Sequence, residues 1–199
     1  RITGNHEYIE EAKYQFLIHI KYLTDKKTGL WFHGWTFHGN HNFSEALWGR
    51  GNCWVTIAIP EFLNMVPYDE SFKRYLVETL QLQVSALKEY QDPSGMWHTL
   101  IDDPDSYVES SATCGFCYGI LRAVHLGYID IEYKENAYKA LEPILNNITE
   151  DGIVNQVSYG TAMGRESKQF YKNIEIKSMP YGQALAILYL LEILEDIRI

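Results

Sequence analysis

The sequence is poor in cysteine, in positive charge and in long apolar runs, and each shortage excludes a class of protein. Three cysteines are an odd number and too few for a disulfide framework, so we expect reduced thiols and a cytoplasmic protein. The 17 Lys and Arg against 26 Asp and Glu give a net charge of −9, which argues against nucleic acid as the main partner. The longest apolar run, ALAILYLL at 184–191, falls far short of the roughly 20 residues that cross a bilayer, which argues against a membrane protein.

Two local features concern a possible redox or metal role and the start of the chain. Cys114 and Cys117 have CxxC spacing, but no second pair accompanies them, so we interpret them as buried thiols and keep a redox or metal role as the alternative. The N-terminal RITGNHEYIEEA has no initiator Met and no signal-peptide pattern, and it begins directly on a helix-like segment. We therefore expect that sequence upstream of Arg1 is missing.

Six segments have helical periodicity, and two kinds of segment alternate along the chain. The amphipathic, charged ones are residues 6–23, 69–90 and 131–148. The more apolar ones are residues 44–66, 108–126 and 180–197. An amphipathic helix faces water on one side, whereas a helix that is apolar nearly all round is buried. The pattern therefore predicts alternating outer and inner helices.

The links between these helices alternate in length. Those from outer to inner helices are long, and each opens with turn residues followed by a glycine: Gly29, Gly95 and Gly152. Repeats of two helices predict stacked hairpins. Long loops in compact domains are usually functional, so we expect the site at the end of the molecule where these loops emerge.

The predicted fold is all-α, with three helical hairpins that form about half of an (α/α)6 barrel, and residues 1–199 are one partial domain. A half-ring leaves the flanks of its apolar inner helices exposed, which a soluble monomer rarely tolerates. We therefore expect missing upstream sequence, a partner chain that completes the barrel, or self-association.

The stretch WFHGWTFHGNHNFSEALWGRGNCW, residues 31–54, concentrates the chemistry of the chain. We expect a helix to begin at Ser44 as N-cap, which places Arg50 and Trp54 on one face. A cation near a helix N-terminus is unfavourable unless a nearby anion compensates its charge, so Arg50 is a candidate to bind a ligand carboxylate bidentately. The alternative is a structural ion pair with Glu45 or a loop carboxylate.

Trp48 and Trp54 are candidates to stack on sugar rings, with burial in the core as the alternative. The candidate zinc ligands are His33, His38 and His41, but their spacing lacks the glutamate of a helical zinc motif and has no cysteine companion. We predict no metal and no cofactor. No pair of loop carboxylates stands out as a glycosidase dyad, because Glu109 fits a helix cap and DDPDSY, residues 102–107, fits a turn.

Three motifs, in this order, resemble the unsaturated rhamnogalacturonyl hydrolases of glycoside hydrolase family 105, relatives of the family 88 unsaturated glucuronyl hydrolases. They are GLWFHGW with HNFSEALWGRGNCWVTIAIPEFL, LIDDPDSYVESSATCGFCYGIL, and VSYGTAMG with YKNIEIKSMPYGQALAILYLLEIL. The resemblance matches the C-terminal portion of a typical member. It implies an (α/α)6 barrel that removes unsaturated uronic acid from lyase-generated pectin or rhamnogalacturonan oligosaccharides. The implied chemistry adds water across the C4=C5 double bond, after which the product opens and expels the sugar.

The resemblance also implies roles for four residues in substrate binding. His33 matches a site histidine, Trp48 an aromatic side chain that packs on the unsaturated sugar, and Arg50 the arginine at that sugar's subsite, while Trp54 resembles a further wall of the cleft. The catalytic aspartate of the family lies upstream, so we name no catalytic residue.

Two other functions remain open from the sequence. One is a non-catalytic α-helical repeat module for binding or interaction, which the exposed flanks and the missing acid favour. The other is a different α/α-barrel carbohydrate enzyme such as a polysaccharide lyase, in which Tyr159 and His33 would supply the base system if the loops bring them together.

Overall fold

The computed structural model describes residues 2–198, and within them the regular structure is helical. The elements are α1 (Glu7–Leu23), α2 (Gly49–Met65), α3 (Glu70–Glu89), α4 (Ser110–His125), the 3-10 turn η1 (Ile131–Tyr133), α5 (Lys134–Lys139), α6 (Leu141–Asn146), α7 (Gln169–Lys172) and α8 (Pro180–Arg198). Backbone pairing between extended segments of this part of the chain is limited to isolated bridges. The prediction of an all-α fold is confirmed.

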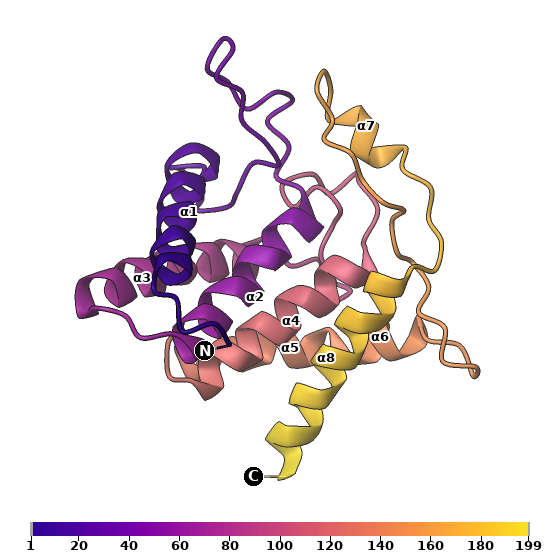
Figure 1. The fold of residues 1–199 in the computed structure, drawn as a ribbon. Helices are drawn as coiled ribbons and strands as arrows, with labels where there is room; N and C mark the ends of the chain where they lie inside the picture. The colour runs from indigo at the N-terminus through magenta and orange to yellow at the C-terminus, as the bar shows by residue number, and fades with distance from the viewer. Residues whose placement is uncertain (1, 199) are drawn as a thin grey trace.

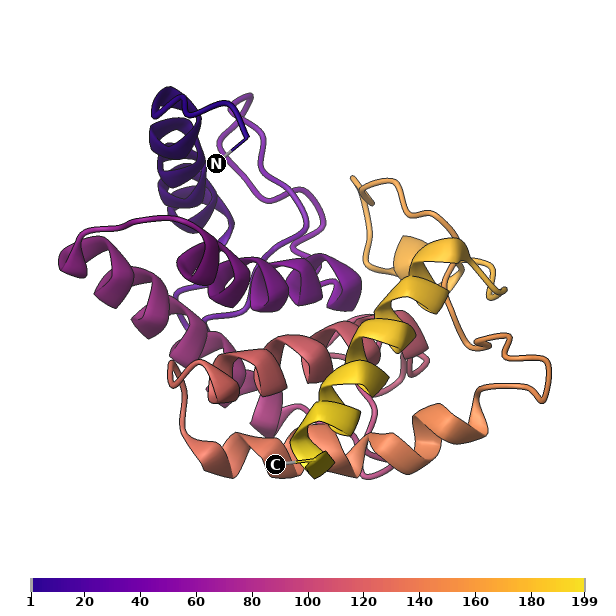
Figure 2. The ribbon, with the colours of Figure 1, turned by 60° about the horizontal axis from the view of Figure 1, so that its bottom comes forward.

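The inner helices α2, α4 and α8 pack side by side, with α4 in the middle (Figures 1 and 2). Glycines on α4 permit its close approach to α2. A Cβ at Gly119 would lie 2.6 Å from the backbone oxygen of Thr56, and one at Gly115 would lie 2.5 Å from Sγ of Cys53. The small-residue composition of segment 108–126 is therefore the physical reason why two inner helices fit together so tightly.

Two predicted helices differ from the observed ones. The segment 131–148 is not one helix but η1, α5 and α6, with the break at Ala140. Pro143 has no N–H to donate to the carbonyl of Lys139, and that carbonyl lies instead against the backbone of Gly95. The short helix α7 inside the last long link was not predicted.

The start of α2 is the second difference, because the helix begins at Gly49 and not at Ser44. The N-cap residue Trp48 is extended and forms an antiparallel bridge with Leu100, through Gly49 N–H to Thr99 O and Ile101 N–H to Leu47 O. Glu45 has a left-handed backbone with φ of 54°, which is incompatible with a first helical turn. Ser44 is therefore a loop residue, and the prediction that it caps the helix is wrong.

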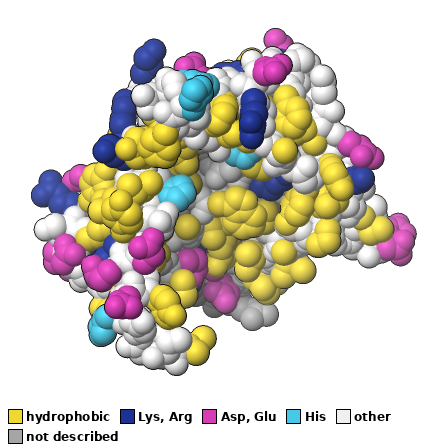
Figure 3. Space-filling view, turned by 45° about the horizontal axis from the view of Figure 1, so that its top comes forward, with side chains coloured by type: hydrophobic (Ala, Val, Ile, Leu, Met, Phe, Trp, Pro, Cys, Tyr) yellow, Lys and Arg dark blue, Asp and Glu magenta, His cyan; other side chains and the backbone are white. Residues whose placement is uncertain are grey.

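Apolar side chains remain exposed on the flanks of this set of hairpins. On α8 they include Ile187, 58% exposed, and Leu191, 51% exposed, one turn apart. On the opposite flank, α1 and α2 border an apolar cavity of about 600 Å³. In the view of Figure 3, hydrophobic side chains gather on both sides of a hollow in the surface. Three hairpins with open flanks correspond to the predicted half of a barrel.

None of the helices described between residues 2 and 198 is both long enough and apolar enough to cross a membrane. The thiols of Cys53, Cys114 and Cys117 are buried and free, as the sequence predicted. Burial raises the pKa of all three thiols.

Candidate functional site

The long loops gather at one end of the inner helices, at the top of Figure 1. The first loop, residues 24–48, is attached to the third, residues 147–179. Ser44 Oγ donates a hydrogen bond to Gly164 O at 2.7 Å. The backbone at Gly34 contacts Met163 so closely that a Cβ there would overlap its sulfur. The two loops therefore form one rim, although 120 residues separate Ser44 from Gly164.

Arg50, at the start of α2, is a buried cation beside this rim and is only 4% exposed. Its guanidinium lies between the rings of Trp48, at 4.8 Å, and Tyr181, at 4.4 Å. Its hydrogen bonds go to oxygen acceptors from α4 and the third loop: Ser111 Oγ, Ser158 O and Oγ, Tyr159 O and Thr161 Oγ1. Protein contacts therefore hold this side chain in one orientation.

The carboxylate partner of Arg50 is Glu109, whose Oε1 lies 3.7 Å from Nη1. Glu109 is 1% exposed and caps α4, where it accepts hydrogen bonds from Ala112 N and from Ser158 N. The interpretation of Glu109 as a cap is confirmed. The structural ion pair that the sequence left open is present, but with Glu109 rather than with Glu45.

His33 and Trp48 pack against each other on the cavity side of this arginine. Their ring centroids are 4.2 Å apart, and Nδ1 of His33 lies 2.6 Å from the hydroxyl of Tyr171. Burial, and secondarily the charge of Arg50, lower the pKa of His33 to about 4. His33 is therefore neutral at neutral pH.

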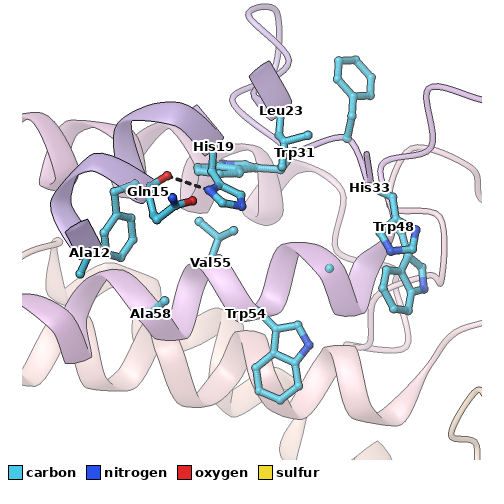
Figure 4. Close-up of a pocket in the computed structure, with 13 residues that line it drawn as sticks. Ala12, Gln15, His19, Leu23, Trp31, His33, Trp48, Trp54, Val55 and Ala58 are labelled. Atoms are coloured by element: carbon cyan, nitrogen blue, oxygen red, sulfur yellow. Dashed lines mark hydrogen bonds between the residues drawn. The ribbon is translucent and has the colours of Figure 1, made fainter. Parts of the chain in front are cut away.

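The cavity brings together three of the four predicted site residues. His33, Trp48 and Trp54 all line it, and Trp54 projects from α2 with 47% of its surface exposed (Figure 4). Arg50 lies behind Trp48 and does not contribute to the lining. Among the described residues that line this cavity there is no Asp and no Glu.

The remaining sequence candidates lie elsewhere. His38 and His41 are exposed on the tip of the first loop, and His41 Nδ1 accepts a hydrogen bond from Phe43 N. Within residues 2–198, no three His, Cys, Asp or Glu side chains are grouped so that they could hold a metal ion. Tyr159 is exposed and has Lys177 Nζ 4.0 Å from the centre of its ring. The tyrosine bound to His33 is Tyr171, not Tyr159.

The segment 102–107 forms a turn, as predicted, and two of its aspartates anchor the third loop. Asp102 pairs with Lys168 at 2.8 Å and Asp103 with Lys172 at 2.7 Å. The hydrogen bond from Lys172 is the largest cause that lowers the pKa of Asp103. These pairs hold the segment that carries α7, and thereby Tyr171, against the second loop, residues 90–109.

The sequence reasoning missed Tyr171, Tyr181 and Ser158. Tyr171 and Ser158 lie in a long loop without periodicity, and Tyr181 follows the proline that opens α8. The one available signal was that Ser158, Tyr171 and Tyr181 all fall within the third motif of the family resemblance.

Packed helical hairpins, with a cavity near their loop end lined by tryptophan, histidine and aliphatic side chains, place the chain in the class of helical-barrel proteins. The chain belongs to glycosyl hydrolase family 88, whose family model matches residues 1–196. It is 33% identical over 196 residues, or 98% of its length, to the unsaturated rhamnogalacturonyl hydrolase YesR of Bacillus subtilis (strain 168). The predicted relation to this group of hydrolases is confirmed.

Two solved structures are similar over 98% of the chain, both with a TM-score of 0.94. Both are described as possible members of the GH105 family. One, from Salmonella enterica, is 51% identical, and the other, from Klebsiella pneumoniae, is 50% identical. The chain covers 55% of YesR and 52% and 51% of the two structures. It therefore spans about half the length of these relatives.

Proposed function

We propose that the protein contributes the sugar-binding half of a hydrolase that removes unsaturated uronic acid from lyase-generated pectin or rhamnogalacturonan oligosaccharides. The observation that carries this proposal is the identity to YesR across 98% of the chain. The cavity supports it, because indole faces such as that of Trp54 suit the stacking of a sugar ring.

The residues of the cavity have distinct roles in this proposal. The rings of Trp48 and Trp54 pack on the sugar, and His33 donates a hydrogen bond to one of its oxygens. Arg50 supplies a positive charge behind Trp48 that favours the uronic carboxylate, although Glu109 partly balances this charge. Water then adds across C4=C5, with the hydroxyl on C5 and the proton on C4, and the hydrated ring opens and releases the neighbouring sugar.

We infer that the proton donor and the opposite wall belong to a completing half-barrel of three further hairpins, or to a second copy of the chain. Three observations support this inference: the absence of Asp and Glu from the described cavity lining, the apolar flanks of α1, α2 and α8, and the half-length coverage of the relatives. Residues 1–199 are then one partial domain. The three free thiols support the cytoplasm as its compartment.

The test is hydrolysis by the chain joined to its completing half. With an unsaturated rhamnogalacturonan disaccharide, the ultraviolet absorbance of the C4=C5 bond should disappear as product forms. Residues 1–199 alone should leave the absorbance unchanged. If the completed protein binds saccharides but never consumes the double bond, the chain belongs instead to a non-catalytic binding module.

A further inference from the structure

The direction of the hydrogen bond between His33 and Tyr171 decides which nitrogen of the imidazole carries the proton. Tyr171 lies on α7 in the third loop and is fully buried. Its hydroxyl lies 2.6 Å from His33 Nδ1 and also accepts a hydrogen bond from the backbone N–H of Gly164 at 2.9 Å. The contact joins residues 138 positions apart.

The number of protons around the Tyr171 hydroxyl restricts which of its neighbours donates and which accepts. A phenol has one proton to donate, and the amide of Gly164 can only donate, so it occupies a lone pair of Oη. If Nδ1–H of His33 also donated to Oη, the buried phenolic proton would need another acceptor. The alternative acceptor is Ser44 Oγ, which donates its own proton to Gly164 O. Burial raises the pKa of Tyr171, and the neighbouring Gly164 amide and Ser44 hydroxyl partly offset this. A neutral imidazole nitrogen is a better acceptor than an aliphatic hydroxyl.

We propose that Tyr171 is a positioning residue: its hydroxyl donates to Nδ1 and thereby fixes His33 as the tautomer with its proton on Nε2. This imidazole then presents a neutral N–H donor to a sugar oxygen in the cavity beside Trp48 and Trp54. The role in sugar binding rests on the function proposed above, whereas the tautomer itself does not.

The tautomer limits what His33 can do. With Nδ1 occupied by Tyr171 and a proton already on Nε2, the ring has no free lone pair with which to act as a base toward the cavity. Its low pKa, about 4, also keeps it from donating a proton as an imidazolium at neutral pH. His33 therefore selects and orients the sugar, and the proton that reaches C4 comes from another group.

The decisive measurement is the ¹⁵N spectrum of the imidazoles of the 199-residue chain, with His33 assigned by comparison with His33→Gln. We expect a protonated Nε2 and an unprotonated, hydrogen-bonded Nδ1 near neutral pH. A protonated Nδ1 in the unsubstituted chain would overturn the proposal, and this result needs neither a variant nor a substrate.

Substitution then tests the cause. In Tyr171→Phe both tautomers should be populated, and the titration midpoint of His33 should rise by about one pH unit, because one hydrogen bond to the neutral form is lost. Ser44→Ala should leave the tautomer unchanged, and a shift in that variant would show that Ser44 accepts the phenolic proton. Tyr189→Phe is the matched control, since it removes a buried hydrogen bond to Ala137 O far from the site.

Kinetics of the completed protein separate this inference from the proposed function. Tyr171→Phe should raise KM about tenfold with a smaller change in kcat, because a donor that binds substrate and transition state alike has been disordered. Unchanged kinetics in an active enzyme would refute the positioning role. Absence of turnover in every form would refute the proposed function and leave the tautomer result intact.

Discussion

The guanidinium of Arg50 and the carboxylate of Glu109 form a buried ion pair that joins α2 to α4, with Nη1 3.7 Å from Oε1. Each of these two groups also has hydrogen-bond partners other than the ion pair. Glu109 also accepts from Ser111 Oγ and two backbone amides, and Arg50 also donates to the loop at residues 158–161. The pair therefore connects two inner helices and the third loop behind the candidate sugar site, and its charges are costly to separate.

Glu109→Gln should lower the free energy of unfolding by about 3 kcal/mol, because it leaves the charge of Arg50 buried without its partner. Urea unfolding of the 199-residue chain measures this change. The control is Glu78→Gln, which breaks an exposed pair with Arg74 on α3 and should have no measurable effect. Equal stability of the two variants would show that Ser111, Ser158 and Thr161 suffice to hold Arg50.

The alternation of outer and inner helices could be predicted from the sequence because burial imposes periodicity on each helix separately. The start of α2 could not be predicted in this way. A serine followed by an acidic residue is a good local N-cap signal, but pairing of residues 47–49 with residues 99–101 overrides it. The break at Ala140 had a visible cause in Pro143, yet a proline near the end of an amphipathic pattern also fits a helix that simply ends early.

The candidate site was predictable only in part for a similar reason. His33, Trp48 and Trp54 lie within 22 residues of one another, and they do line one cavity. Tyr171 and Ser158 reach the same place through a loop held by ion pairs to the turn at Asp102 and Asp103. Such contacts depend on tertiary structure, and no spacing of residues along the sequence predicts them.

Gly119→Ala should destabilise the chain by about 1–3 kcal/mol, although alanine favours helix more than glycine does. The new Cβ would lie 2.6 Å from the backbone oxygen of Thr56, so α2 and α4 must move apart. Gly160→Ala is the control, because nothing lies within 4 Å of a Cβ at that position. Thermal unfolding of both variants measures the difference, and a stabilised Gly119→Ala would mean that the helices are less tightly packed.

His33 should make stability depend on pH between about 6.5 and 4. Its pKa in the folded chain, about 4, lies below the ordinary value of 6.5, so the unfolded chain binds a proton first as the pH falls. The contribution is fully present above pH 6.5, decreases as the pH falls, and is lost near pH 4. His33→Gln should therefore show a shallower decline of urea midpoints between pH 7 and 4.5 than the unsubstituted chain. His38→Gln, on an exposed loop tip, should keep the original slope, and identical slopes for all three would contradict the buried, neutral imidazole.

The apolar surface of α8 should make residues 1–199 associate in solution. Ile187 and Leu191 lie one turn apart on that surface, and each exposes more than half of its side chain. Ile187→Lys with Leu191→Lys should reduce the mass measured by sedimentation to that of a monomer, while helix content and unfolding stay within about 0.5 kcal/mol of the unsubstituted chain. Leu82→Lys, at a position on α3 that is also exposed, should leave association unchanged, since no large apolar neighbour on α3 is equally exposed. In the completed barrel the same pair of lysines should abolish assembly, because the surface of α8 would then be covered by a further hairpin. A monomeric unsubstituted chain would show that this flank does not drive association, and the completing half-barrel would then need another docking surface.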